Sequence, residues 1–243
     1  MNIILPFLNS FSSCSNLTKF EINYNSILFI IFDLVTEYIK KLEPFLPENT
    51  AERIANWIIR TNCQFRIARS RSTRFGDYRH PFGSLGHRIS VNHDLNPYAF
   101  LITTVHEFAH LKTCNDHRNK VKPHGEEWKA NFKLLMQPFL KENVFPDDIQ
   151  QAISSYLRNP SASSCTDLKL FRTLKKYDSP KNNGKMTVES LPFGSQFQWK
   201  DGRIFQKMKK NRTRYQCLEV HSQRLYLFSP IAEITPVRDD SQA

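Results

Sequence analysis

The segment His106-Glu-Phe-Ala-His110 contains the side chains of this chain that are best suited to chemistry. Residues four apart lie on the same face of an α-helix, so the imidazoles of His106 and His110 can bind one metal ion. Glu107 lies between them and can reach a water on that metal without saturating the metal. Two His ligands and a carboxylate base on one stretch of helix are typical of zinc hydrolases. The sequence therefore predicts a Zn²⁺ cofactor, with Glu107 as the catalytic general base.

A catalytic zinc needs a third protein ligand and one position open to water. Metzincins supply that ligand at a fixed spacing, with Gly three residues after the second His and another His three residues later. Here Thr113 and Asp116 occupy those two positions, so the sequence excludes the metzincin class.

Two histidines downstream compete for the third position. His117 lies only seven residues beyond His110, but the polar stretch 114–122 predicts a loop. His124 opens a new helix, whose apolar residues keep helical spacing: Trp128, Phe132, Leu135 and Phe139. A ligand at the start of a packed helix is held more firmly than one on a loop, so we favour His124 over His117.

The helix that carries the first two histidines has a clear start in the sequence. Asn96 is a good N-cap, and Pro97 suits the first helical position. Three apolar residues then recur at helical spacing: Ile102, Val105 and Ala109. They predict a buried stripe with both histidines at its edge, where polar side chains need a specific reason to lie.

Taken together, His106-Glu-Phe-Ala-His110 and His124-Gly-Glu-Glu-Trp128 resemble the SprT/Spartan family of SprT-like zinc metallopeptidases. The upstream order resembles that family as well: a basic strand, a turn and a second strand precede the zinc helix. Here they correspond to Phe65-Arg-Ile67, the arginine-rich run 69–76 and Arg88–Asn92. The resemblance covers residues 48 to 140 approximately. Many zincins share the helix motif alone, and the His-Gly-x-x-Trp partner makes the resemblance specific.

The resemblance implies a small α+β, zincin-like metallopeptidase domain that cleaves proteins, often close to DNA. It implies that His106, His110 and His124 hold the zinc and that Glu107 is the general base. One departure concerns the zinc ribbon in which many SprT-like proteins end. This chain has no Cys-x-x-Cys pair among its five cysteines, so a ribbon of the usual spacing cannot form. The cysteines are Cys14, Cys63, Cys114, Cys165 and Cys217.

The charge distribution and the cysteines indicate which partners and which cellular compartment to expect. The net charge of +11 is uneven: residues 61–120 carry 9 basic and 4 acidic side chains, and residues 181–243 carry 11 and 6. Concentrated positive charge favours nucleic acid as a partner, although solubility alone is the simpler reading. The odd, unpatterned set of cysteines argues against a disulfide framework and predicts a reducing, cytoplasmic location.

The N-terminal residues predict neither a signal peptide nor a membrane anchor. Residues 2–11 are apolar, but no Lys or Arg precedes Lys19, so the charged start of a signal peptide is missing. The apolar run 27–35 contains Asp33 and is too short to cross a bilayer, which needs about twenty apolar residues. We expect no stable association with a membrane.

The pattern of elements divides the chain into four parts. These are a disordered lead-in over 1–24, the SprT-like domain over 25–158, a linker over 159–185 and an all-β module over 186–238. Within the second part we expect two helices, at 26–42 and from a cap at Asn49 or Thr50. Strands at 63–68 and 87–92 follow, separated by a basic, turn-rich connection over 69–80. A last helix starts at Pro146 and ends at Leu157.

The C-terminal part predicts a small antiparallel barrel or sandwich without a zinc ribbon. Short β-rich runs at 197–200, 203–208, 213–220 and 225–228 are separated by turns, of which Asp201-Gly202 is a strong hairpin signal. Basic residues cluster near aromatic ones around one hairpin, which allows stacking on single-stranded nucleic acid. The aromatic residues are Phe197, Trp199, Phe205 and Tyr215. The alternative is that they form the core, and a domain of this size needs most of them inside.

The sequence thus predicts a zinc-dependent endopeptidase, a hydrolase that acts on DNA-associated proteins. The expected nucleic-acid contacts are Arg69, Arg71, Arg74, Lys207, Lys209 and Lys210. Tyr98, His87 and Arg74 are candidates to stabilise the oxyanion. The alternative is a non-catalytic nucleic-acid-binding protein with a structural zinc, against which an intact Glu107 counts. A zinc hydrolase that acts on a bond other than a peptide is a third hypothesis.

Overall fold

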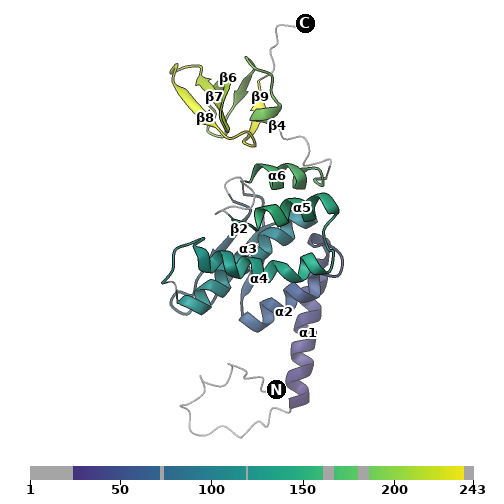
Figure 1. Ribbon diagram of the computed structural model, residues 1–243. Coiled ribbons are helices and arrows are strands. Elements are labelled where there is room, and N and C mark those ends of the chain that lie inside the picture. The colour runs from purple at the N-terminus through teal and green to yellow at the C-terminus, as the bar shows by residue number, and fades with distance from the viewer. Residues whose placement is uncertain (1–23, 72–73, 119, 161–166, 180–185, 238–243) are drawn as a thin grey trace.

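The computed structural model of the protein describes residues 24–71, 74–118, 120–160, 167–179 and 186–237. They form an α+β structure, in which a helical body with a three-stranded sheet is followed by an all-β unit (Figure 1). Residues 1–23 of the expected lead-in lie outside the described part. In that part, none of the helices combines the length and the apolar character that crossing a bilayer requires.

Two helices begin the body. Helix α1 (Tyr24–Leu42) ends at a short 3-10 turn, Glu43–Phe45, where Pro44 cannot continue the α-helical hydrogen bonds. Helix α2 (Ala51–Thr61) buries one apolar face and ends at Asn62, whose left-handed backbone lets its N–H bond to the carbonyl of Ile59. Both helices lie where the sequence pattern places them.

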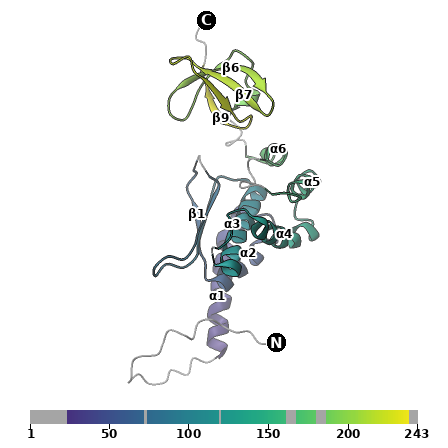
Figure 2. The ribbon, with the colours of Figure 1, turned by 60° about the vertical axis from the view of Figure 1, so that its left-hand side comes forward.

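The first sheet has the strand order β1-β3-β2, with β1 (Gln64–Ala68) parallel to β3 (Arg88–Asn92) and β2 (Gly76–Arg79) antiparallel to β3. In the described part of the chain, helices pack against only one of its faces (Figure 2). Alternate residues point to opposite faces, so Phe65, Ile89 and Val91 are buried under the helices. Strand β2 corrects the expectation that 69–80 is a connection without regular structure. A strand of four residues that contains a glycine gives little pattern to detect.

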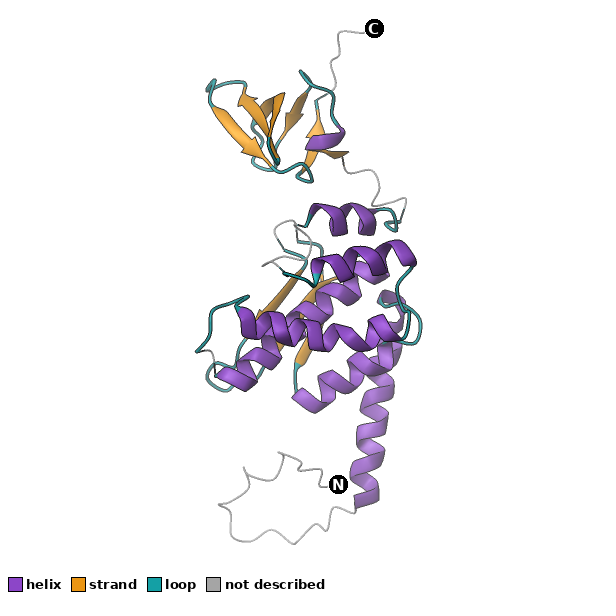
Figure 3. Cartoon of the chain, in the orientation of Figure 1, coloured by secondary structure: helices purple, strands orange, loops and turns teal. Residues whose placement is uncertain are grey.

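Helix α3 (Pro97–His117) is the centre of the body, and α4 (Glu126–Lys141) packs against it (Figure 3). The side chain of Asn96 accepts a hydrogen bond from the N–H of Ala99, which confirms the predicted cap. The buried amide of Asn131 on α4 donates to Thr113 and to Asp116 on α3, each at 3.0 Å. Helix α3 continues to residue 117, so the expected loop over 114–122 is wrong in its first part.

The expected linker over 159–185 contains a packed helix. Helix α5 (Asp147–Tyr156) agrees with the prediction, but α6 (Leu168–Lys175) was not expected. Leu170 and Leu174 of α6 belong to the main core, and the Asn96 side chain donates to the Leu174 carbonyl at 2.9 Å. The body therefore extends through α6, and the linker prediction is wrong for that segment.

The all-β unit is a six-stranded antiparallel sheet with the order β4-β9-β5-β6-β7-β8. Its strands are β4 (Met186–Thr187), β5 (Gln196–Gln198), β6 (Ile204–Asn211), β7 (Arg214–Glu219), β8 (Leu225–Phe228) and β9 (Glu233–Pro236). Phe197, Phe205 and Phe228 form the centre of a separate core. The aromatic cluster of the sequence is thus mainly core, as its size required. An ion pair between Arg172 on α6 and Glu189 links this unit to the body.

Candidate metal centre

Three imidazoles converge at the middle of α3. The Nε2 atom of His106 lies 3.3 Å from Nε2 of His110 and 3.3 Å from Nε2 of His124. One ring nitrogen from each residue can serve as a ligand, and these atoms all lie within 4.8 Å of one another. The helix brings the first pair together because the two residues are four apart, and the turn before α4 adds the third.

These spacings fit a tetrahedral zinc site. Zinc–nitrogen bonds of about 2.0–2.1 Å at tetrahedral angles hold two nitrogens roughly 3.4 Å apart. Without a metal the convergence is poorly satisfied, because Nε2 of His106 carries either one N–H or one lone pair and can form a good hydrogen bond with only one of its two close neighbours. His106 is only 7 % exposed, and its Nδ1 atom has no hydrogen-bond partner within the described residues. The three-histidine group could therefore hold a metal ion.

The structure brings His124 to this cluster and leaves His117 outside it. His117 is the last residue of α3, seven residues beyond His110, which is about 10 Å along the helix axis at 1.5 Å per residue. His124 lies two residues before the start of α4, in a turn closed by the Gly125 N–H and the Lys122 carbonyl at 2.9 Å. The expectation that His124 opens the helix is therefore correct only in approximate position.

The turn holds His124 in a backbone conformation that side chains rarely adopt. Its φ is +57°, in the left-handed region. A Cβ on Gly125 would lie 3.0 Å from the Lys122 carbonyl oxygen, so any other residue there would have to push this carbonyl back by a few tenths of an ångström. Backbone strain of this kind concentrates at functional sites, because surrounding structure must maintain it.

Trp128 forms the floor of the cluster. It is fully buried, and its ring centroid lies 4.6 Å from His106, 5.4 Å from His110 and 4.7 Å from His124. Phe132 stacks behind it at 5.1 Å. Trp128, one turn after His124, was predicted to hold that residue in place, and in the structure it packs against all three imidazoles.

Burial keeps the three imidazoles neutral, which is the form that binds a metal. It lowers the pKa of His110 to about 3, with the neighbouring His124 adding to the shift. Burial also lowers the pKa of His106, together with the charges of the other two histidines, and it lowers the pKa of His124.

Glu107 is buried next to the cluster, at 6 % exposure. Burial and the nearby Asp77 raise the pKa of its carboxyl to about 8, against the opposing effects of Arg71 and of the Tyr78 N–H. A Cβ on Gly76 would lie 2.4 Å from Glu107 Oε1, so strand β2 passes too close for any other residue at that position. Glycine at residue 76 thus lets the sheet cover the carboxylate.

Tyr78 is a site residue that the sequence reading missed. Its ring lies parallel to that of His110, with an angle of 3° and centroids 6.1 Å apart. Its hydroxyl bonds to Nδ1 of His87 at 2.9 Å, and burial raises the pKa of the phenol. The signal for it in the sequence is weak, because the four-residue strand that carries Tyr78 contains a glycine and shows no clear alternation of apolar and polar residues.

The three oxyanion candidates lie in different places. Tyr98 packs against Phe145 and Tyr177 near the start of α3, more than two turns before His110. Arg74 forms an ion pair with Asp77. His87 is joined to the site through Tyr78, so it is the one candidate in contact with a residue that touches the histidine cluster.

The structure separates the residues predicted to bind nucleic acid. Lys207 is 2 % exposed, and its ammonium donates to the carbonyls of Glu189 and Leu191, so the prediction is wrong for this residue. Arg71 donates to Asn92 and Ser90 and fixes the loop that precedes β2. The other four are exposed: Arg69, Arg74, Lys209 and Lys210.

Comparison of the chain with models of protein families, with curated proteins and with solved structures gives no match in any of the three.

Proposed function

We propose that this protein is a zinc-dependent endopeptidase of SprT-like type, with a zincin-like catalytic domain. The observation that carries the proposal is the convergence of three neutral imidazoles beside a buried carboxylate. A purely structural zinc is normally closed by a fourth protein ligand, whereas three histidines leave a position for a reactant. The described residues place no cysteine or carboxylate in the histidine group.

His106, His110 and His124 would hold the zinc, and each has a distinct support. The first two are fixed by the regular geometry of α3, and the third by its strained turn. Trp128 packs against all three rings and excludes water from behind them. A zinc ion bound there would polarise a peptide carbonyl and lower the pKa of a bound water to about seven.

Glu107 would move the proton. A general base must accept a proton and release it again, and the burial that raises the pKa of the metal-free carboxyl makes the carboxylate a better proton acceptor than an exposed one. Its carboxylate would take the proton of the attacking water and pass it to the leaving amine nitrogen. Gly76 and the Tyr78 N–H hold the carboxylate in place from strand β2, which limits its motion between the two steps.

The substrates would be proteins, including those bound to DNA. The support for DNA is the basic balance of residues 61–120 and 181–243, and it is weaker than the support for zinc. The proposal that the protein is cytoplasmic rests on the cysteine pattern, and Cys63, Cys114 and Cys217 are free thiols in the structure.

Cleavage of unfolded model proteins by the purified chain tests the proposal. Glu107→Gln should keep the zinc but lose about 10²–10⁴-fold in rate, because the base is removed and the ligands remain. Glu52→Gln makes the same chemical change at an exposed position of α2 and should leave the rate unchanged. The assay is run with and without single-stranded DNA. Undiminished cleavage by Glu107→Gln would rule out the mechanism.

A further inference from the structure

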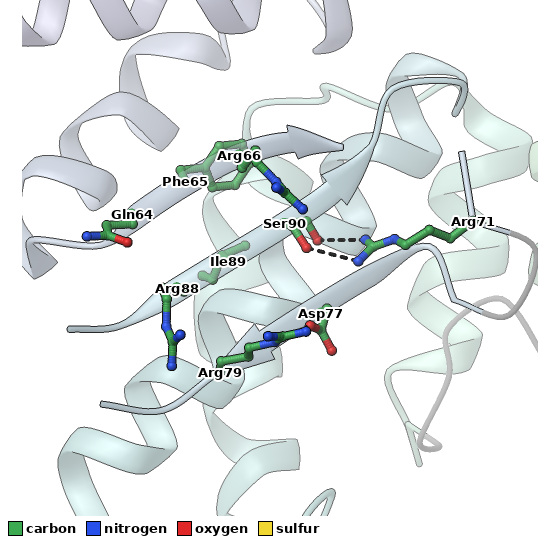
Figure 4. Close-up of a pocket in the computed structure, with 9 residues that line it drawn as sticks. All are labelled: Gln64, Phe65, Arg66, Arg71, Asp77, Arg79, Arg88, Ile89 and Ser90. Carbon is green, nitrogen blue, oxygen red and sulfur yellow. Dashed lines mark hydrogen bonds and ion pairs between the residues drawn. The ribbon is translucent and has the colours of Figure 1, made fainter. Parts of the chain in front are cut away.

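The face of the first sheet that no helix covers contains a basic pocket. It has a volume of about 440 Å³, and Figure 4 shows the nine residues that line it. They are Gln64, Phe65, Arg66, Arg71, Asp77, Arg79, Arg88, Ile89 and Ser90. Four are arginines and one is acidic, so the lining carries a formal charge of +3. It lies on the face opposite to α3, and its lining residues Phe65 and Ile89 direct their side chains to the covered face.

The strand register explains how the arginines gather. Gln64 on β1 pairs with Arg88 on β3, which pairs with Arg79 on β2, so these three form one row across the sheet. Arg66, Ser90 and Asp77 form the next row. Residues of neighbouring rows are two apart on each strand, so both rows project to the same face.

One pairing in this pocket is unfavourable by itself. Arg79 and Arg88 are directly opposite each other on antiparallel strands, and like charges in that relation destabilise a sheet. Arg66 and Arg74 also add positive potential at Arg71. This repulsion is present when no anion is bound. An anion between the guanidinium groups would remove it.

The single carboxylate does not neutralise the pocket. Asp77 already forms ion pairs with Arg79, at 2.9 Å, and with Arg74. Its charge is therefore not available to neutralise the other arginines of the pocket. Arg71 donates to Ser90, as Figure 4 shows, and the buried Nε of Arg88 has no partner within the described residues. Arg66 is exposed, and its guanidinium forms no ion pair with any of the described residues.

We propose that this pocket binds phosphate groups, either of a nucleic-acid backbone or of a free nucleotide. Guanidinium groups present planar pairs of N–H donors that match phosphate oxygens, and two or more around one site bind it firmly. The volume suits a group of nucleotide size. Phe65 is the one aromatic residue in the lining, and its side chain is buried on the other face of the sheet, so binding should not depend on base stacking or sequence. The inference does not depend on the metal centre.

Binding of fluorescein-labelled oligothymidylate at low salt, measured by anisotropy, tests the nucleic-acid source. Arg66→Gln combined with Arg88→Gln should weaken binding about a hundredfold, roughly tenfold for each charge-assisted contact. The slope of log affinity against log salt should fall by about 1.4, at roughly 0.7 for each single-strand phosphate. The matched control, Lys141→Gln with Arg158→Gln, removes two exposed charges from α4 and the end of α5 and should change neither value by more than a small amount.

Two further measurements distinguish a nucleic-acid backbone from a free phosphate compound as the ligand, and show that a loss of binding is not caused by misfolding. Inorganic pyrophosphate that binds and displaces the oligonucleotide indicates a site for free phosphate compounds, and oligonucleotide binding alone indicates a backbone site. Arg66→Glu, at an exposed position, should retain the wild-type melting temperature and still lose binding. The proposal is overturned if wild type binds neither probe, if the pocket variants bind like the control, or if a chelator abolishes binding, which would assign the phosphate to the metal centre.

Discussion

Buried polar groups are handled differently in the two units of this protein. Around α3 several buried atoms have no hydrogen-bond partner within the described residues: Thr103 Oγ1, Thr104 Oγ1, His106 Nδ1 and Trp128 Nε1. Among the described residues of the all-β unit, the buried polar side chains of Thr187, Lys207 and Glu219 all have hydrogen-bond partners. Lys207 donates to two carbonyls, and Glu219 accepts from the N–H groups of His221 and Ser222.

The difference separates a site from a structural core. An unpaired buried polar atom costs free energy, so a fold tolerates several together only where another requirement fixes them. In the all-β unit the buried ammonium of Lys207 has hydrogen-bond partners, and its role is to stabilise the fold. Burial of a charged residue is thus a weak sign of function, and burial without a partner is a stronger one.

The largest effect expected from this contrast concerns Glu107 in the metal-free protein. Its folded pKa of about 8 lies above its unfolded value of 4.5, so the folded state holds the proton more tightly. The contribution to stability is full below the unfolded pKa and is lost as the pH rises through the folded pKa. With chelator present, Glu107→Gln should unfold at the same denaturant concentration as wild type near pH 4. Near pH 9 it should be more stable by on the order of 5 kcal/mol.

Equilibrium denaturation across that pH range measures the difference between the two proteins, in which the contributions of the histidines cancel. Added zinc should reduce the difference, because a nearby cation favours the ionised carboxylate. If wild type and Glu107→Gln were equally stable at every pH, Glu107 would have to be solvated. The contrast between the two units would then no longer hold for this residue.

The second effect concerns the metal. His124→Ala should weaken zinc binding by about two to three orders of magnitude, if a binding energy of roughly 10–16 kcal/mol is shared among four ligands. His117→Ala is the matched control, because it removes an imidazole from the end of α3, outside the cluster. Competition with a coloured chelator measures both affinities. Loss of zinc from His117→Ala with retention by His124→Ala would reverse the ligand assignment.

The part of the site that lies on one helix could be predicted from the sequence, because helical spacing fixes which residues share a face. The cap at Asn96 and the ligand pair of α3 follow directly from local sequence. Strand β2 and helix α6 could not be predicted in this way. Gly76 matters only because it meets Glu107 across the fold, and α6 is held by Asn96, which lies more than seventy residues earlier. Such contacts leave no periodic signal in a short segment.

Lysine 207 shows the same limit for charge. In the sequence it is one of a basic cluster with Lys209 and Lys210, and all three were expected to face a nucleic acid. Strand alternation turns Lys207 inward, where Tyr215 lies 4.2 Å and Phe193 4.9 Å from its ammonium. The β-bulge between 207 and 209 then changes the register, so that proximity in sequence does not predict a shared face.

The smallest effect expected is on stability alone. Lys207→Met should lower the free energy of unfolding by about 1–3 kcal/mol, because the carbonyls of Glu189 and Leu191 lose their donor. The loss is limited, because burial already lowers the pKa of this lysine and the variant no longer pays to bury a charge. Lys209→Met, at the exposed neighbouring position, should change stability by less than about 0.5 kcal/mol. Chemical denaturation measures both changes, while zinc content and oligonucleotide binding should stay at wild-type values in Lys207→Met. An undiminished stability together with weaker oligonucleotide binding would show that this buried lysine serves a ligand, and the two units would then no longer differ in the way described.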